Sequence, residues 1–157
     1  MMKLIPAAAL VAGLALAASA NAQIVHINPG KAFISRAVTV PAGADMIYVS
    51  GITPQAADKT KPTELGDTKT QTVGVLNKIK AILEGLGLGM ADVVKMQVFL
   101  VHDARAPMDF KAFMEGYTQF FGGSQPNLPA RSVVGVASLA NPGFLVEIEV
   151  IAAKDNK

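Results

Sequence analysis

The feature that most constrains this chain is the segment from Asn127 to Val136, which places one arginine in an otherwise apolar strand. Pro129 ends the element before it and biases Leu128 toward extended geometry. The residues that follow form a short, largely β-branched run bounded by turn residues, which is typical of a buried strand. The guanidinium of Arg131 therefore needs an anion. A glutamate of the protein is the more common partner for a buried charge, and a ligand is the alternative.

The N-terminus has the three parts of a Sec-type secretory signal. Met1-Met2-Lys3 is a short positive start, residues 4–18 are apolar and rich in alanine, and Ala20-Asn21-Ala22 is a small-residue cleavage site before Gln23. The apolar run is short for a membrane span and no stop-transfer charges follow it, which argues against a transmembrane anchor. We predict a signal peptide over residues 1–22 and a single domain over residues 23–157. The mature protein is then periplasmic or secreted, with no stable membrane span.

Composition excludes several classes of function. The chain has 157 residues, of which 51% are hydrophobic and 17% charged, so it can bury a core. Its formal net charge is +2, or +1 after loss of Lys3 with the signal, which is not the footprint of a nucleic-acid-binding protein. The sequence has no cysteine, so thiol catalysis and cysteine metal sites are excluded. His26 and His102 form no cluster with further metal ligands, and we predict no metal site.

Hydrophobic periodicity predicts the element order β-β-β-α-β-α-β-β. The first helix is expected from a capping box at Thr68 to Gly85, and the second has Pro107 in its first turn. Strands are expected over residues 23–27, 32–40, 46–49, 93–101 and 144–152, in addition to the strand of Arg131. Two helices against one sheet give an α+β sandwich. The other sheet face carries apolar residues, which we expect a partner subunit to cover.

Only one set of residues combines side chains that could form a catalytic site. Glu147 and Glu149 share one face of the expected last strand, and Arg131 precedes them. An arginine can clamp a carboxylate through two hydrogen bonds, and a glutamate can orient or deprotonate a water. With the small residues Ser50 and Gly51, this set indicates hydrolysis of a small molecule that carries a carboxylate.

Several segments of the chain resemble the RidA/YjgF/UK-type family, the reactive intermediate deaminases. They occur in the order and spacing of the family over nearly all of residues 32–153. The matching segments are Ile47 to Pro54, Asp92 to Lys95 with Val98 to Leu100, Tyr117 to Phe121, Pro129 to Ser132, and Val146 to Ala152.

The resemblance implies a chorismate-mutase-like sandwich, with a six-stranded, mostly antiparallel sheet and two helices on one face. It further implies a homotrimer with sites between subunits, which hydrolyses 2-imino and enamine acids to 2-keto acids and ammonia without a cofactor. The family roles carry over to Arg131 as the carboxylate-binding residue and to Glu147 as the residue that positions water. The backbone at Gly51 assists in binding the substrate. Further substrate-binding positions by this resemblance are Ser50, Val133 and Ile34.

The chain departs from the family pattern around the arginine. Where members often have Pro-Tyr-Ser-Gln-Ala-Val, residues 33–38 place Ile34 and Arg36 at the Tyr and Gln positions. Met114 stands at the position of an Asn common in the second helix, and Val133 at that of a frequent Cys. The alternative function is therefore a non-catalytic exported trimer that binds small carboxylates or a protein partner. An endoribonuclease role fits poorly with the low net charge.

Overall fold

The structure, a computed structural model, describes residues 23–28, 30, 32–56, 60, 64–102, 107–123 and 125–155. The predicted signal peptide lies outside these residues. Within them the chain forms β1 (Val25–Ile27), β2 (Ala37–Thr39), β3 (Asp45–Ile52), α1 (Thr68–Gly85), β4 (Val93–Val101), α2 (Phe110–Tyr117), β5 (Ala130–Val136) and β6 (Val146–Lys154), with a 3-10 turn at Met90–Asp92. This order confirms the α+β class.

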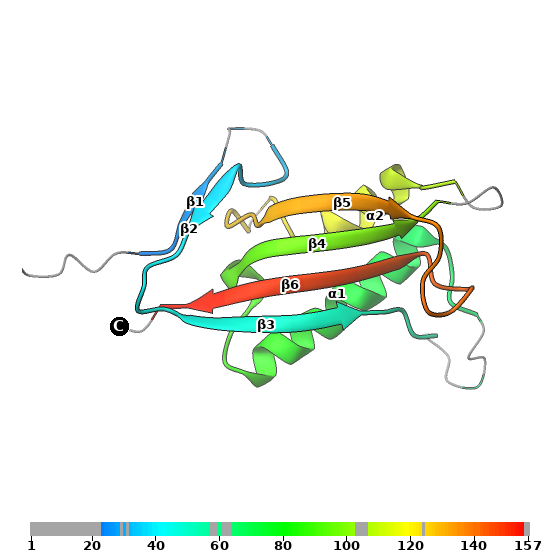
Figure 1. Ribbon diagram of the computed structural model, residues 1–157, viewed down its shortest axis with the longest axis horizontal. Coiled ribbons are helices and arrows are strands. Elements are labelled where there is room, and N and C mark those ends of the chain that lie inside the picture. Colours follow the sequence, from blue (N-terminus) through cyan, green and yellow to red (C-terminus); the bar gives the residue numbers. More distant parts are fainter. Residues whose placement is uncertain are drawn as a thin grey trace, which may run out of the picture.

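Four of these strands form the main sheet, in the spatial order β3-β6-β4-β5 (Figure 1). Strand β6 is antiparallel to both β3 and β4, whereas β5 is parallel to β4. The two long helices lie together on one face of this sheet, as predicted. Strands β3 and β5 are its two edges.

The expectation of one continuous six-stranded sheet is wrong, because β1 and β2 form a separate antiparallel hairpin beyond one end of the main sheet (Figure 1). The strand expected over residues 32–40 is reduced to residues 37–39. Before it, Ser35 forms an isolated parallel bridge to Ala130 of the main sheet. The Ser35 hydroxyl is buried within hydrogen-bond distance of the Leu128 carbonyl and the Asn28 amide oxygen. These side-chain hydrogen bonds to the chain around Ser35 take the place of a continued ladder of backbone hydrogen bonds.

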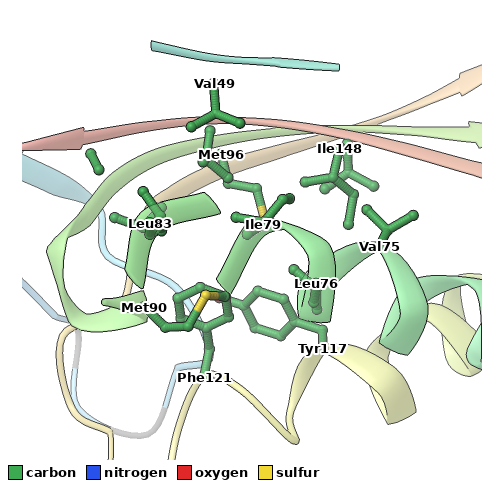
Figure 2. Close-up of a cluster of buried hydrophobic side chains, with 14 of the residues drawn as sticks. Val49, Val75, Leu76, Ile79, Leu83, Met90, Met96, Tyr117, Phe121 and Ile148 are labelled. Carbon is green, nitrogen blue, oxygen red and sulfur yellow. The ribbon is translucent and has the colours of Figure 1, made fainter. Parts of the chain in front are cut away.

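The core lies between the sheet and the helices. Side chains of α1 at helical spacing, Val75, Leu76, Ile79 and Leu83, are all fully buried. Figure 2 shows them between the sheet residues on one side and the aromatic rings of Tyr117 and Phe121 on the other. The two rings are stacked, with centroids 4.9 Å apart. The second helix is thereby fixed to the first by an aromatic layer.

Both helices begin with aspartate caps that the sequence patterns missed. Asp67 caps α1 by accepting a hydrogen bond from the Thr70 amide at 2.8 Å, so the predicted capping box at Thr68 is wrong. Asp109 caps α2 in the same way, which places Pro107 before the helix and not in its first turn. An aspartate satisfies the free amides of the first turn as well as a threonine does. The end of α1 at Gly85 is confirmed.

The sheet face opposite the helices is uncovered in the single chain. Tyr48 of β3 is 74% exposed there, and Val134 of β5 is 45% exposed. A shallow hollow of about 230 Å³ lies between them and is lined in part by Lys95, Gln97 and Glu149. None of the helices in the described ranges is long and apolar enough to cross a membrane.

Candidate functional site

Arg131 extends from the edge strand β5 toward the helices. It pairs in register with Met96 of β4, whose side chain is fully buried in the core, so the two side chains share the helix-covered face. The guanidinium carbon lies 4.1 Å from the ring centroid of Tyr117 and 5.1 Å from that of Phe113. The predicted arginine in a buried strand is therefore present, half-buried and stacked on the aromatic side chains of α2.

The guanidinium has no anionic partner among the described residues, where the ion pairs are Lys69–Glu115 and Lys80–Glu84. Its Nη2 atom donates only to the thioether sulfur of Met114, at 3.4 Å, and its buried Nη1 atom has no hydrogen-bond partner there. Burial lowers the pKa of Arg131, and Tyr117 works in the opposite direction. The group still carries its charge at neutral pH. A buried charge with one unsatisfied nitrogen is a position where an anion is strongly favoured.

Tyr117 connects the arginine to the N-terminal part of the domain. Its ring is fully buried, and its hydroxyl donates to the Phe33 carbonyl at 2.8 Å. Burial raises the pKa of Tyr117 to about 12, against the opposing effect of the Arg131 charge. The Ser35 amide donates to the Pro129 carbonyl at 3.0 Å. These two contacts hold residues 33–35, and Ile34 with them, beside the start of β5.

A second group of predicted site residues gathers around a β-bulge in β3. Val49 pairs with Val150 and Ile52 with Ile148, so Ser50 and Gly51 lie opposite one residue of β6. A methyl group added to Gly51 would be 2.0 Å from the carboxylate oxygen Oε1 of Glu147. The Glu147 side chain therefore lies directly against the backbone of Gly51, and only glycine leaves room for it.

The structure places the predicted site residues on opposite faces of the main sheet. Glu147 lies between the buried Val146 and Ile148, so its side chain points away from the helices. Val133, which packs against the core, is on the helix-covered face with Arg131. Strands β5 and β3 are also at opposite edges (Figure 1). One chain thus unites Glu147 with Gly51 but does not direct its own Arg131 toward them.

Each of the two histidines contacts a backbone group. His26 Nδ1 lies 2.7 Å from the Leu128 carbonyl oxygen, and His102 Nδ1 accepts from the Met108 amide at 3.1 Å. In the part of the chain that the structure describes, no three His, Cys, Asp or Glu side chains are placed to hold a metal ion. Phe113 and Tyr117 are the neighbours of Arg131 that sequence reasoning did not assign to the site. Their aromatic spacing on a helix indicated core, which is also where they lie. Met114 was already noted as a departure from the family pattern near the arginine.

The fold and the site define a class of protein: a small α+β sandwich whose edge strand presents an arginine with no anionic partner among the described residues, and whose open sheet face carries a glutamate. The family model described as endoribonuclease L-PSP matches residues 24–154. The chain belongs to this family, which includes the RidA/YjgF proteins.

Individual relatives agree with this assignment. A RutC family protein of Pyrococcus horikoshii is 39% identical over 111 residues, which span 71% of this chain and 81% of the relative. TdcF of Escherichia coli, named as a reactive intermediate deaminase, is 36% identical over 69% of this chain and 79% of its own. A solved structure of a Rid family protein, YyfB of Yersinia pestis, has a TM-score of 0.65 at 29% identity and covers 82% of this chain and 97% of its own.

Proposed function

We propose that the protein hydrolyses reactive 2-imino and enamine acids to 2-keto acids and ammonia, without a cofactor. The observation that carries this proposal is the half-buried guanidinium of Arg131, which has no carboxylate partner among the described residues and one buried nitrogen without a hydrogen bond. A ligand carboxylate supplies the missing anion. A solved structure of the relative TdcF is described as holding serine, an amino acid with such a carboxylate; it has a TM-score of 0.57 at 35% identity and covers 73% of this chain and 84% of its own.

In this proposal the two charged residues have separate tasks. Arg131 binds the carboxylate and so fixes the adjacent imine carbon. Glu147 accepts a proton from a water, whose oxygen adds to that carbon, and passes the proton to the imine nitrogen. In the resulting carbinolamine Glu147 moves the hydroxyl proton to the amine nitrogen, so that ammonia leaves as the C–N bond breaks and the carbon–oxygen bond becomes the carbonyl of the keto acid. Gly51 positions the Glu147 carboxylate by leaving it room against the backbone.

We further propose that the site lies between two subunits of a homotrimer. Support comes from the placement of Arg131 and Glu147 on opposite faces of one sheet and near opposite edges of it. A second chain can bring its own Glu147 to the arginine of the first. The exposed Tyr48 and Val134 on the open face are the apolar surface that such an assembly would bury. Export through the N-terminal signal is part of the same proposal.

A coupled assay tests the activity. Threonine dehydratase or an amino-acid oxidase generates the imine in the cuvette, and formation of the keto acid is followed with and without mature protein. We expect Arg131→Ala to abolish the acceleration, because loss of one partner of a charge-assisted contact costs about 2–5 kcal/mol. Arg131→Lys should rescue poorly, since an ammonium lacks the planar fork. Lys111→Ala, which removes an exposed cation of α2, is the control and should behave as wild type.

The result that overturns the proposal is a wild-type protein that leaves imine hydrolysis at its spontaneous rate. If such a protein still binds 2-keto acids through Arg131, the non-catalytic carboxylate-binding trimer replaces it. If Arg131→Ala instead lowers the melting temperature strongly and changes nothing else, the arginine has a structural role.

A further inference from the structure

The wall that α2 builds around the guanidinium of Arg131 is apolar, and this bears on which acids fit. We propose that Met114, the partly exposed member of this wall, selects acids with an apolar side chain and rejects hydroxylated ones, while the fully buried Phe113 and Tyr117 hold the guanidinium beside it. The inference rests on the proposed function, because it assumes that Arg131 binds the carboxylate of the substrate.

The first observation is the direction of the three side chains. Phe113 and Tyr117 are one helical turn apart on α2 and present their rings to the same guanidinium, at 5.1 and 4.1 Å. Met114 reaches the guanidinium with its sulfur, 3.4 Å from Nη2. Phe113 and Tyr117 are fully buried and Met114 is partly exposed, so a ligand whose carboxylate meets Arg131 arrives within reach of Met114.

The second observation is that these three residues offer such a ligand no free polar group. The only strong hydrogen-bonding atom among their side chains is the Tyr117 hydroxyl, which already donates to the Phe33 carbonyl at 2.8 Å. The thioether of Met114 is a weak acceptor and no donor. Val133, on the same face of β5 as Arg131, adds another apolar side chain.

A hydroxyl group placed against this wall loses its hydrogen bonds to water and regains little, whereas a methyl group loses nothing and gains contacts. An apolar pocket discriminates against a ligand that merely adds a hydroxyl by up to about 100-fold. The unbranched methionine side chain also adapts to ligands of different length. The wall thus favours imines derived from aliphatic or aromatic amino acids over those derived from serine-like or acidic ones.

Two keto acids of matched shape test the inference. 2-Ketobutyrate and hydroxypyruvate differ by one methyl group in place of one hydroxyl. Isothermal titration of the mature protein gives the dissociation constant of each for the wild type, for Met114→Leu and for Met114→Gln. Leucine keeps the wall apolar, and glutamine supplies a donor and an acceptor at similar length. Thermal unfolding of each variant shows that it is folded.

We expect the wild type and Met114→Leu to bind 2-ketobutyrate at least about 10-fold more tightly than hydroxypyruvate, and Met114→Gln to reduce this ratio to about 3-fold or less. Equal binding of both acids by the wild type overturns the inference and leaves the proposed function in place. A ratio that is the same in all three proteins overturns the role of Met114. Binding of neither acid overturns the proposed function, and this inference with it.

Discussion

The carboxylate of Glu147 lies so close to Gly51 that a methyl group on the glycine would be 2.0 Å from Oε1. The two residues belong to neighbouring antiparallel strands, β6 and β3, at the point where a bulge offsets the register. The backbone of β3 therefore determines where the carboxylate can be. Gly51 matters here for the space it leaves and not for a special backbone angle, because its φ is not positive.

This relationship predicts that Gly51→Ala impairs catalysis more than folding. The added methyl group displaces the end of a flexible side chain, so we expect the free energy of unfolding to fall by less than about 1 kcal/mol. The displaced carboxylate no longer positions water, and a shift of this kind lowers turnover by about 10- to 100-fold. Thermal unfolding and the coupled imine assay measure the two effects.

The control for this variant is Gly74→Ala in α1, where an added methyl group meets nothing within 4 Å. Alanine in place of a helical glycine should stabilise the protein by about 0.5–1 kcal/mol. Its turnover should equal that of the wild type. A Gly51→Ala protein with wild-type turnover would show that the position of the Glu147 carboxylate is irrelevant to the reaction.

Glu147→Gln should separate binding from turnover. The amide keeps the size of the side chain but cannot accept a proton from water, so turnover should fall by about 100-fold or more. Binding of 2-ketobutyrate should be unchanged, because Arg131 is untouched. Titration calorimetry and the coupled assay on the same preparation provide the comparison, and loss of binding in this variant would contradict the division of tasks.

Mixing two inactive proteins tests whether the site is shared between subunits. Arg131→Ala and Glu147→Gln chains are unfolded together, refolded as an equal mixture and assayed. If each site takes Arg131 from one chain and Glu147 from the next around a symmetric trimer, about a quarter of the wild-type activity should return. Each variant refolded alone is the control. A mixture as inactive as its components would contradict a shared site.

Tyr117 should titrate far above an ordinary tyrosine. The chain has two tyrosines, so Tyr48→Phe leaves Tyr117 as the only source of tyrosinate absorbance. Burial raises the pKa of Tyr117 from 10.0 to about 12. The folded state holds this proton more tightly than the unfolded state does. The bound proton therefore contributes fully to the free energy of unfolding below pH 10, and this contribution is lost as the pH rises toward 12. The loss is on the order of 2 kcal/mol in the free energy of unfolding.

Denaturant unfolding of the same Tyr48→Phe protein at a series of alkaline pH values measures how far the free energy of unfolding falls as the pH rises. Adding Tyr117→Phe should remove this pH dependence. That second change also removes the hydrogen bond to the Phe33 carbonyl, at a net cost of about 1 kcal/mol at every pH. A single tyrosine that titrates near pH 10 would show that the ring is accessible to solvent.

Cleavage of the predicted signal is directly measurable. Expressed at full length in a Gram-negative host, the protein should appear in the periplasm with Gln23 as its first residue. Ala20→Arg removes a small residue from the cleavage site and should leave the precursor intact. Intact mass spectrometry distinguishes the two forms, and periplasmic protein that retains residues 1–22 would contradict the prediction.

Sequence reasoning predicted most of the elements and the two helices on one sheet face, but not the division of the strands into two sheets. The helical spacing of Val73, Leu76, Ile79 and Leu83 is a local property of one helix, and it predicted three residues of the buried face of α1 correctly. Val73 is only partly buried, and Val75 takes the fourth core position. The division of the strands into two sheets depends on contacts such as that of Ser35 with Ala130, which join distant parts of the chain. No local pattern encodes such a contact, so the single six-stranded sheet was an error.

The geometry of the candidate site also depends on contacts that no local sequence pattern encodes. Alternation along β6 correctly indicated that Glu147 and Glu149 share a face, but it cannot say which face meets the helices. That Arg131 and Glu147 lie on opposite faces of the sheet could therefore be seen only in the folded structure. The aromatic spacing of α2 indicated core, and it gave no sign that Tyr117 also supports the guanidinium, because its partner Phe33 is far away in sequence.

The buried Nη1 atom of Arg131 also has a kinetic consequence. A carboxylate that uses this nitrogen can bind only after the side chains that bury it have moved aside. That movement is a first-order step that precedes capture, so the observed rate of binding levels off as the acid concentration rises. The plateau equals the rate at which the nitrogen is uncovered, and rapid-mixing experiments would read that rate directly.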